Sequence, residues 1–393
     1  MKFMHLSDLH LGKRLIEVSL LEDQKYILDQ IIHIAEEEKP QAVLISGDIY
    51  DRSNPPEEAM TLFGHFIRRL TEAGCKVLVI SGNHDSSERV AYLGELVREN
   101  GVYLSPVYNG HLESVTLEDE YGTVNFYLMP YIHPESVKRF FPEETIASAN
   151  DAARLVLGES APDTSGRNVI LSHQLILGSS FDEREQKAVG TLDNVDPKLY
   201  EGFDYVALGH IHNAQFVGRK DKTMRYCGTP LVYSKKEART AKPLPLGEAE
   251  PAAKTVTMVD LKKKGDVSCY EIPLSPLREV RLVKGEFNTL LEKGPDAGSE
   301  DDYYYITLTD EDDVIPNAAV QLRSRFGKVL EIDFDNARTR AGEEVSIGTV
   351  EAEEKTPMEL LSDLYRLMRQ HEMSEEAKAF AREVMQETEG FQE

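Results

Sequence analysis

The chain has 393 residues, 41% of them hydrophobic, so it is long enough for two or three domains, the first with a sizeable core. No apolar run approaches the roughly 18 residues that span a bilayer, no signal-peptide core precedes Asp8, and the three cysteines form no C-x-x-C pair, so we expect a cytoplasmic protein without disulfides. The 69 acidic and 44 basic residues give a formal net charge of −25, which argues against nucleic-acid binding by the bulk surface.

The N-terminal part predicts alternating strands and helices. We expect a strand at 2–7, a helix at 22–38, a strand at 42–45, a helix that begins at Pro55-Pro56 and a strand at 76–80. This order implies parallel strands joined by right-handed crossovers. The side chains predicted to face the core from the second helix are Met60, Phe63, Ile67 and Leu70.

Five predicted strands end in the same way, with an apolar run, one or two small residues and then a good metal ligand. The five ligands are Asp8, Asp48, Asn83, His173 and His210. His10 and His212 follow two positions after the first and the last of these, so each pair points the same way in an extended chain. Because ligands of α/β sheets bind outside the carboxyl ends of the strands, we expect all seven side chains at one site.

These seven residues predict a centre for two metal ions. If Asp48 bridges, each ion has four protein ligands, and positions remain for water and substrate oxygens. A mixed imidazole, carboxylate and amide set without thiolate favours manganese or iron over magnesium, and zinc stays open. Two ions roughly 3.5–4 Å apart would generate the nucleophile and stabilise the attacking and leaving oxygens of a phosphodiester.

Residues beside the ligands are candidates for catalysis and substrate binding. His84 adjoins Asn83, and it should face the scissile phosphate as general acid or charge stabiliser, with Asp85 as the residue that orients it. Basic side chains nearby could contact substrate, although each taken alone is more readily explained as a solvated surface charge. These basic candidates are Lys13, Arg14, Arg52 and Arg89.

The rest of the chain predicts a second, partly antiparallel sheet and further domains. It contains a hairpin at 112–117 and 124–129, a loosely helical stretch at 137–157, an irregular loop at 178–194 and a surface loop at 235–254. We therefore expect a catalytic domain at 1–275, a small α+β module at 276–336, a linker at 337–355 and two amphipathic helices within 356–393. Residues 341–393 carry 14 acidic and five basic side chains, so this tail should bind a protein and repel DNA.

The motifs resemble those of the calcineurin-like metallophosphoesterases, and within them the SbcD-type nuclease subunits. The resemblance extends over essentially the whole chain through H-L-S-D-L-H-L-G-K, S-G-D-I-Y-D-R-S-N-P-P, I-S-G-N-H-D-S, F-D-E-R-E-Q-K-A-V-G-T-L and A-L-G-H-I-H-N-A-Q. It implies an α/β sandwich of two mixed β-sheets flanked by helices, with a capping domain near 276–336. The sequence departs from the family at Thr191, where a second glycine is frequent, and in its longer stretch at 235–254.

The resemblance also implies an activity and partners. It implies a manganese-dependent nuclease that acts on double-strand ends and hairpins, as a homodimer whose C-terminal helices dock on the coiled-coil base of an SbcC-like SMC-family ATPase. By analogy, one ion is held by Asp8, His10, Asp48 and His212, and the other by Asp48, Asn83, His173 and His210.

Two other classes of function stay open at the level of sequence. A phosphatase or cyclic-nucleotide phosphodiesterase would share the seven ligands, but it would need neither the capping module nor the terminal helices. A scaffold that keeps the fold without chemistry should have lost ligands, and none of the seven is missing.

Overall fold

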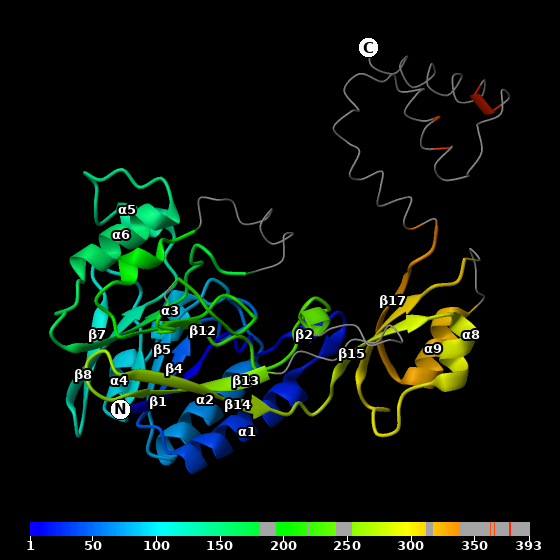
Figure 1. Cartoon of the computed structure of the whole chain (residues 1–393), viewed down its shortest axis with the longest axis horizontal. Helices are drawn as coiled ribbons and strands as arrows, with labels where there is room; N and C mark the ends of the chain where they lie inside the picture. The colour runs from blue at the N-terminus through cyan, green and yellow to red at the C-terminus, as the bar shows by residue number, and fades with distance from the viewer. Residues whose placement is uncertain are drawn as a thin grey trace. The chain divides into compact units, whose positions relative to one another are not determined.

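The computed structural model describes residues 1–180, 194–218, 220–240, 254–311 and 317–337, together with Thr339 and four isolated positions nearer the C-terminus (Figure 1). The described residues form two compact units, which divide between Val280 and Arg281, close to the boundary predicted at 276. The predicted loop at 178–194, the stretch at 235–254, the linker and the terminal helices lie wholly or largely outside the described residues.

One sheet of the first unit contains the strands expected in the N-terminal part. Its order is β14-β13-β1-β4-β5-β6, and the pairs β1–β4, β4–β5 and β5–β6 are parallel, as the alternation of strands and helices predicts. The two strands at its other edge are antiparallel, so the sheet is mixed. The bounds are β1 (Lys2–Leu6), β4 (Ala42–Ser46), β5 (Lys76–Ile80), β6 (Val102–Leu104), β13 (Lys254–Leu261) and β14 (Val267–Leu274).

The second sheet of this unit has the order β11-β12-β10-β9-β8-β7. The pairs β8–β9, β9–β10 and β10–β12 are parallel, whereas β7–β8 and β11–β12 are antiparallel hairpins. The bounds are β7 (Glu113–Asp119), β8 (Gly122–Met129), β9 (Arg167–Ser172), β10 (Tyr205–Leu208), β11 (Gln215–Phe216) and β12 (Met224–Tyr226). A short ribbon, β2 (Arg14–Leu15) with β3 (Val18–Ser19), follows β1.

The two sheets pack face to face around one apolar core. Phe3 of β1 contacts Phe126 of β8 and Tyr205 of β10 edge to face, with ring centroids 5.8 and 5.6 Å apart. All three rings are fully buried, and the same core includes Leu44 and Leu78 of the first sheet. The expected sandwich of two mixed sheets is therefore confirmed.

Helices cover the sandwich, and two helix predictions need correction. The bounds are α1 (Leu21–Glu38), α2 (Glu57–Glu72), α3 (Ser87–Ala91), α4 (Gly94–Arg98), α5 (Pro134–Lys138) and α6 (Ala149–Glu159), with short 3₁₀ turns at η2 (Pro197–Tyr200) and η3 (Glu237–Thr240). The stretch at 137–157 is two helices, because Ser148 and Asp151 form a capping box that starts α6 afresh. In α2, Met60 is 42% exposed, and Ala59 and Phe66 are buried in its place.

The described part of the second unit is a small α+β module. Its elements occur in the predicted order of strand, helix, strand, helix and strand: β15 (Val280–Gly285), α8 (Phe287–Lys293), β16 (Tyr303–Leu308), α9 (Ala318–Phe326) and β17 (Lys328–Phe334). The sheet has the order β15-β16-β17, and both helices pack on it through a core of its own that includes Phe287, Tyr304 and Phe326. A separate core is the mark of a separate domain.

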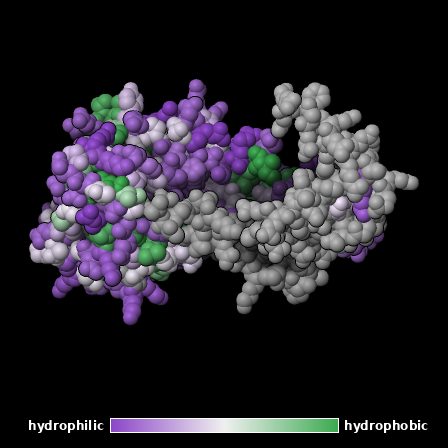
Figure 2. Space-filling model, turned by 90° about the horizontal axis from the view of Figure 1, so that it is seen from above, coloured by the Kyte–Doolittle hydropathy of each residue, from purple (hydrophilic) through white to green (hydrophobic). Residues whose placement is uncertain are grey.

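The surface is largely hydrophilic, as the excess of charged residues in the composition predicts. On the face shown in Figure 2, hydrophilic residues predominate over the coloured surface, and hydrophobic residues gather in small groups. Among the described residues, no helix is long and apolar enough to cross a membrane.

Candidate dimetal centre

The site lies where strands of both sheets end. Asp8, Asp48 and Asn83 follow β1, β4 and β5, while His173 and His210 follow β9 and β10. The segments after β1 and β4 stay paired beyond the sheet, because the Asp8 and His10 amides donate to the carbonyls of Gly47 and Asp48, each at 3.0 Å.

Hydrogen bonds also join the two sheets at the site. The His210 amide donates to Asp8 Oδ1 at 3.0 Å, and His173 Nδ1 donates to the Ser46 carbonyl at 2.7 Å. The carboxyl ends of the strands of the two sheets are thereby held against each other. The structure thus brings all seven predicted ligands to one place.

Four of the seven residues have backbone conformations that side chains rarely adopt. The φ angles of Asp8, His10, Asp48 and His210 are 52°, 43°, 48° and 103°. Such left-handed conformations cost about 1–3 kcal/mol each and concentrate at functional sites, where the surrounding structure imposes them. These chain turns redirect each side chain from the end of its strand toward a common centre.

The small residues before the ligands allow close approach of the backbones. A Cβ atom on Gly209 would lie 1.9 Å from the carbonyl oxygen of Ser46, and one on Gly82 would lie 2.1 Å from Asp48 Oδ1. Both positions therefore require glycine. This accounts in physical terms for the small residues that recur at the predicted strand ends.

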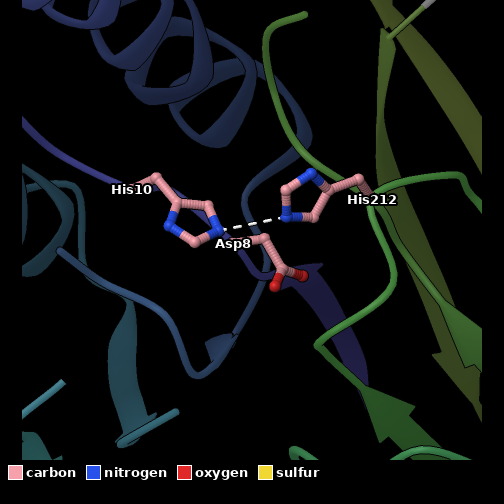
Figure 3. Close-up of side chains that lie close together, drawn as sticks. All are labelled: Asp8, His10 and His212. Carbon is pink, nitrogen blue, oxygen red and sulfur yellow. Dashed lines mark hydrogen bonds between the residues drawn. The ribbon is translucent and has the colours of Figure 1, made fainter. Parts of the chain in front are cut away.

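Asp8, His10 and His212 form the first group of candidate ligands, close enough to one another to hold a metal ion (Figure 3). The Nε2 atoms of His10 and His212 face each other at 3.1 Å. His212 Nδ1 lies 3.1 Å from a carboxylate oxygen of Glu237, which can only accept, so the neutral ring carries its proton on Nδ1 and presents a lone pair at Nε2. Two imidazole nitrogens held at this distance fit adjacent positions around one cation.

Asn83, His173 and His210 form the second group. The Asn83 Oδ1 atom lies 3.1 Å from His173 Nε2 and 2.9 Å from His210 Nδ1. Because the Ser46 carbonyl occupies the other nitrogen of His173, it is Nε2 that faces the group. An amide oxygen and two imidazole nitrogens thus converge from three different strand ends.

Asp48 lies between the two groups. Its Oδ2 atom is 3.4 Å from His173 Nε2 and 3.6 Å from His10 Nε2. Its Oδ1 atom accepts the backbone amide of His84 at 2.9 Å. This is the arrangement expected of a carboxylate that bridges two ions.

The electrostatics of the buried site also suit cations. Burial, reinforced by the charge of Asp48, raises the pKa of Asp8 to about 6. Burial lowers the pKa of His210 to about 3. At His173 burial acts in the same direction, but the charge of Asp48 and its hydrogen bond outweigh it and raise the pKa to about 9. Without metal, a proton on His173 therefore balances Asp48. The lone pairs, carboxylates and buried imidazoles present fit a pair of divalent ions.

His84 lies at the edge of the site, and its partner is not the one that the sequence predicts. The exposed His84 ring lies edge-on to His10, with centroids 4.9 Å apart, and its Nδ1 donates to the Asp51 carbonyl at 2.9 Å. The buried Asp85 carboxylate accepts the amides of Gly82, Ile49 and Tyr50 at 2.9, 3.1 and 3.0 Å. Asp85 therefore orders the backbone around the ligands, and Asp51 holds the His84 ring.

The four basic candidates differ in their positions. Lys13 and Arg52 approach the Asp51 carboxylate at 2.7 and 3.7 Å, beside His84. Arg14 lies in β2, where its guanidinium donates to the carbonyl of Glu17. Arg89 lies exposed in α3. The structure thus groups two of the four with His84.

Sequence reasoning missed the residues that support the ligands. Glu237 contacts His212 from 25 positions further along the chain. The buried Gln24 side chain donates to the His10 carbonyl at 2.7 Å and accepts the Gly12 amide at 2.9 Å. Neither residue stands in a recognisable motif, so only the fold reveals these contacts.

Comparisons with solved structures give matches of low similarity. A Thermus thermophilus protein, TT1561, is 9% identical, covers 69% of this chain and 98% of its own, and has a TM-score of 0.35. A dimetal phosphatase from Danio rerio is 11% identical over 70% of this chain and 99% of its own, with a TM-score of 0.36. The phosphoesterase Yfce from E. coli is 14% identical over 70% and 100%, with a TM-score of 0.26.

Comparisons with protein families are more informative. Residues 276–369 match the SbcD C-terminal family, described as the type 5 capsule protein repressor C-terminal domain. Residues 1–214, more than half of the chain, match the calcineurin-like phosphoesterases. The chain therefore belongs to the calcineurin-like phosphoesterase family and combines that domain with an SbcD-type C-terminal domain.

Proposed function

We propose that the chain is a dimetal DNA nuclease, the catalytic subunit of an SbcCD-like complex that processes double-strand ends and hairpins. The observation that carries this proposal is the position of Asp48 Oδ2 between two converging groups of ligands. All seven ligand assignments belong to the proposal, with Asp8, His10, Asp48 and His212 on one ion and Asp48, Asn83, His173 and His210 on the other. We take the ions to be manganese, because the site mixes imidazole with oxygen ligands.

The chain's own residues have distinct roles in this reaction. When bound, the two ions would supply an activated water nucleophile and would neutralise charge on the phosphodiester. His84 lies beside the first group, and the Asp51 carbonyl holds its Nδ1 proton, so Nε2 is directed away from that anchor and can exchange a proton with the leaving oxygen. Asp85 keeps this loop in place through the backbone.

Lys13 and Arg52 are the basic residues that we assign to the substrate. Both lie at Asp51, close to His84, where a phosphate backbone that reaches the ions would pass. Arg14 and Arg89 are exposed, and neither has a described contact to the ligand residues. With a net charge of −25, the chain must rely on the ions and on a partner for most of its attraction to DNA.

The substrate class is tested with the full-length protein in manganese. We expect hydrolysis of a chromogenic phosphodiester and of linear or hairpin DNA, and loss of both activities after treatment with a chelator. A matched phosphomonoester and a cyclic nucleotide serve as controls. Preferential hydrolysis of either control would favour the phosphatase or cyclic-nucleotide alternative, and failure to bind manganese would favour a non-catalytic scaffold.

The assembly is proposed to contain two nuclease subunits and two SMC-family ATPase subunits in the cytoplasm. The SbcD-type C-terminal match and the acidic amphipathic tail at 356–393 support the ATPase contact. The first unit also has three exposed large apolar side chains close together in the sequence. They are Tyr92, Leu93 and Leu96, which are 72%, 49% and 71% exposed, and they support pairing of two copies.

Co-expression with the ATPase tests both contacts in one experiment. We expect the intact chain to co-purify as a complex of two copies of each subunit, measured by light scattering. Deletion of residues 356–393 should release the ATPase but leave a dimer that still cleaves the small diester, because the described active-site residues lie outside the deleted segment. Undiminished ATPase binding by the truncated chain would show that the docking segment is elsewhere.

A further inference from the structure

We propose that Glu237 is a positioning residue that fixes His212 as a metal ligand, an inference that rests on the proposed dimetal function. Glu237 begins η3 and is 4% exposed. Its Oε1 atom lies 3.1 Å from Nδ1 of His212, on the side of the ring opposite the nitrogen that faces His10. Glu237 thus contacts the metal ligand from behind and is not itself a ligand.

The Glu237 carboxylate is held rigidly by its own partners. Its Oε2 atom accepts from Thr229 Oγ1 at 3.0 Å and from Lys254 Nζ at 2.8 Å. Ser234 Oγ donates to Oε1 at 3.2 Å and accepts the Glu237 amide at 3.3 Å. A carboxylate with both oxygens engaged by charged and hydroxyl groups has little freedom to follow the ring, so the ring must follow the carboxylate.

The same segment also fixes the backbone of His212. The Thr229 amide donates to the His212 carbonyl at 3.1 Å, and Lys254 Nζ approaches that carbonyl at 3.4 Å. Ring and backbone of this one histidine are therefore held by residues that follow β12. The described contacts of His173 differ, because its Nδ1 is held by a backbone carbonyl.

The consequence is a fixed tautomer and a fixed direction for one ligand. With its proton committed to Glu237, His212 can present only the Nε2 lone pair to the ion, and the negative partner makes that lone pair a stronger donor. Loss of such a supporting carboxylate typically weakens metal binding about 10–100-fold. Because His212 belongs to the first group only, the effect should fall on one of the two ions.

Manganese titration of the full-length chain tests this inference through binding, independently of turnover. Free manganese is measured by electron paramagnetic resonance for the wild type, Glu237→Gln and Glu237→Asp. We expect two ions in the wild type and a loss of about 10–100-fold at one site in Glu237→Gln. Glu237→Asp keeps the charge and should recover part of that loss. The control is Asp204→Asn. Asp204 lies just before β10, and its buried carboxylate pairs with Lys264 at 3.1 Å. This variant should bind manganese at both sites with the affinities of the wild type.

A double variant separates positioning from general support of the fold. If Glu237 acts through His212, adding Glu237→Gln to His212→Ala should cause no further loss of manganese affinity, because the two effects are not independent. An equal further loss in that background would overturn the inference, as would unchanged affinity at both sites in Glu237→Gln. A wild type that binds no manganese would instead contradict the proposed function itself.

Discussion

Replacing Asp48 with asparagine is expected to abolish phosphodiester hydrolysis and to release bound manganese. The asparagine has the same shape, but it removes the negative charge that lies 3.4 and 3.6 Å from nitrogens of the two ligand groups. Two divalent ions at bridging distance repel each other, and the negative charge of Asp48 offsets that repulsion by attracting both ions. Loss of several kcal/mol of charge stabilisation corresponds to a decrease in rate of about 10³-fold or more.

Metal content and turnover of a small diester, measured on the same preparation, decide this prediction. Asp204→Asn is again the matched control, since it removes a buried carboxylate of the same unit from outside the site. It should retain two ions and nearly full turnover. An Asp48→Asn protein with a full complement of manganese and near-normal activity would exclude the bridging role.

Replacing His84 with glutamine is expected to leave both ions bound while slowing hydrolysis about 10²–10⁴-fold, the usual contribution of acid–base assistance. The ring lies beside His10 and is anchored at Nδ1 by the Asp51 carbonyl, outside the two groups of converging ligands. Glutamine can still donate a hydrogen bond but cannot transfer a proton. The loss should therefore appear in kcat and leave the manganese affinity unchanged.

The control for His84→Gln is His65→Gln, the same change at an exposed histidine of α2, and it should alter neither quantity. Turnover is measured at saturating manganese, so that a change in metal affinity cannot imitate a change in rate, and manganese binding is titrated separately. A parallel fall in bound manganese would identify His84 as a ligand. A rate within twofold of the wild type would remove it from the catalytic step.

Much of the fold could be predicted from the sequence because its signals are local. The strand, small residue and ligand pattern before Asp8, Asp48 and His210 depends on neighbouring residues, and the structure places all these strand ends together. The apolar face of α2 was predicted less well. A periodic pattern allows a small rotation of the helix, and that rotation decides whether Met60 or Phe66 is buried.

The residues that hold the site residues in place could not be predicted, because their contacts join segments that are distant in the sequence. Asp85 is the neighbour of His84 in sequence, yet its carboxylate turns to the backbone amides of Ile49 and Tyr50. Glu237 meets His212 only because the chain returns after β12. Local sequence patterns contain no information about such returns.

The place of β1 in its sheet has a consequence for synthesis of the protein. This first strand is central, with β4 on one side and β13 on the other, and Lys2 pairs with Asp260. On the ribosome, β1 can pair with β4 early, but its other edge stays unpaired until residues 254–261 have emerged. Exposed strand edges invite pairing with other chains. The nascent chain therefore carries an open edge through most of translation, and the second sheet, with His173 and His210, is made during that interval.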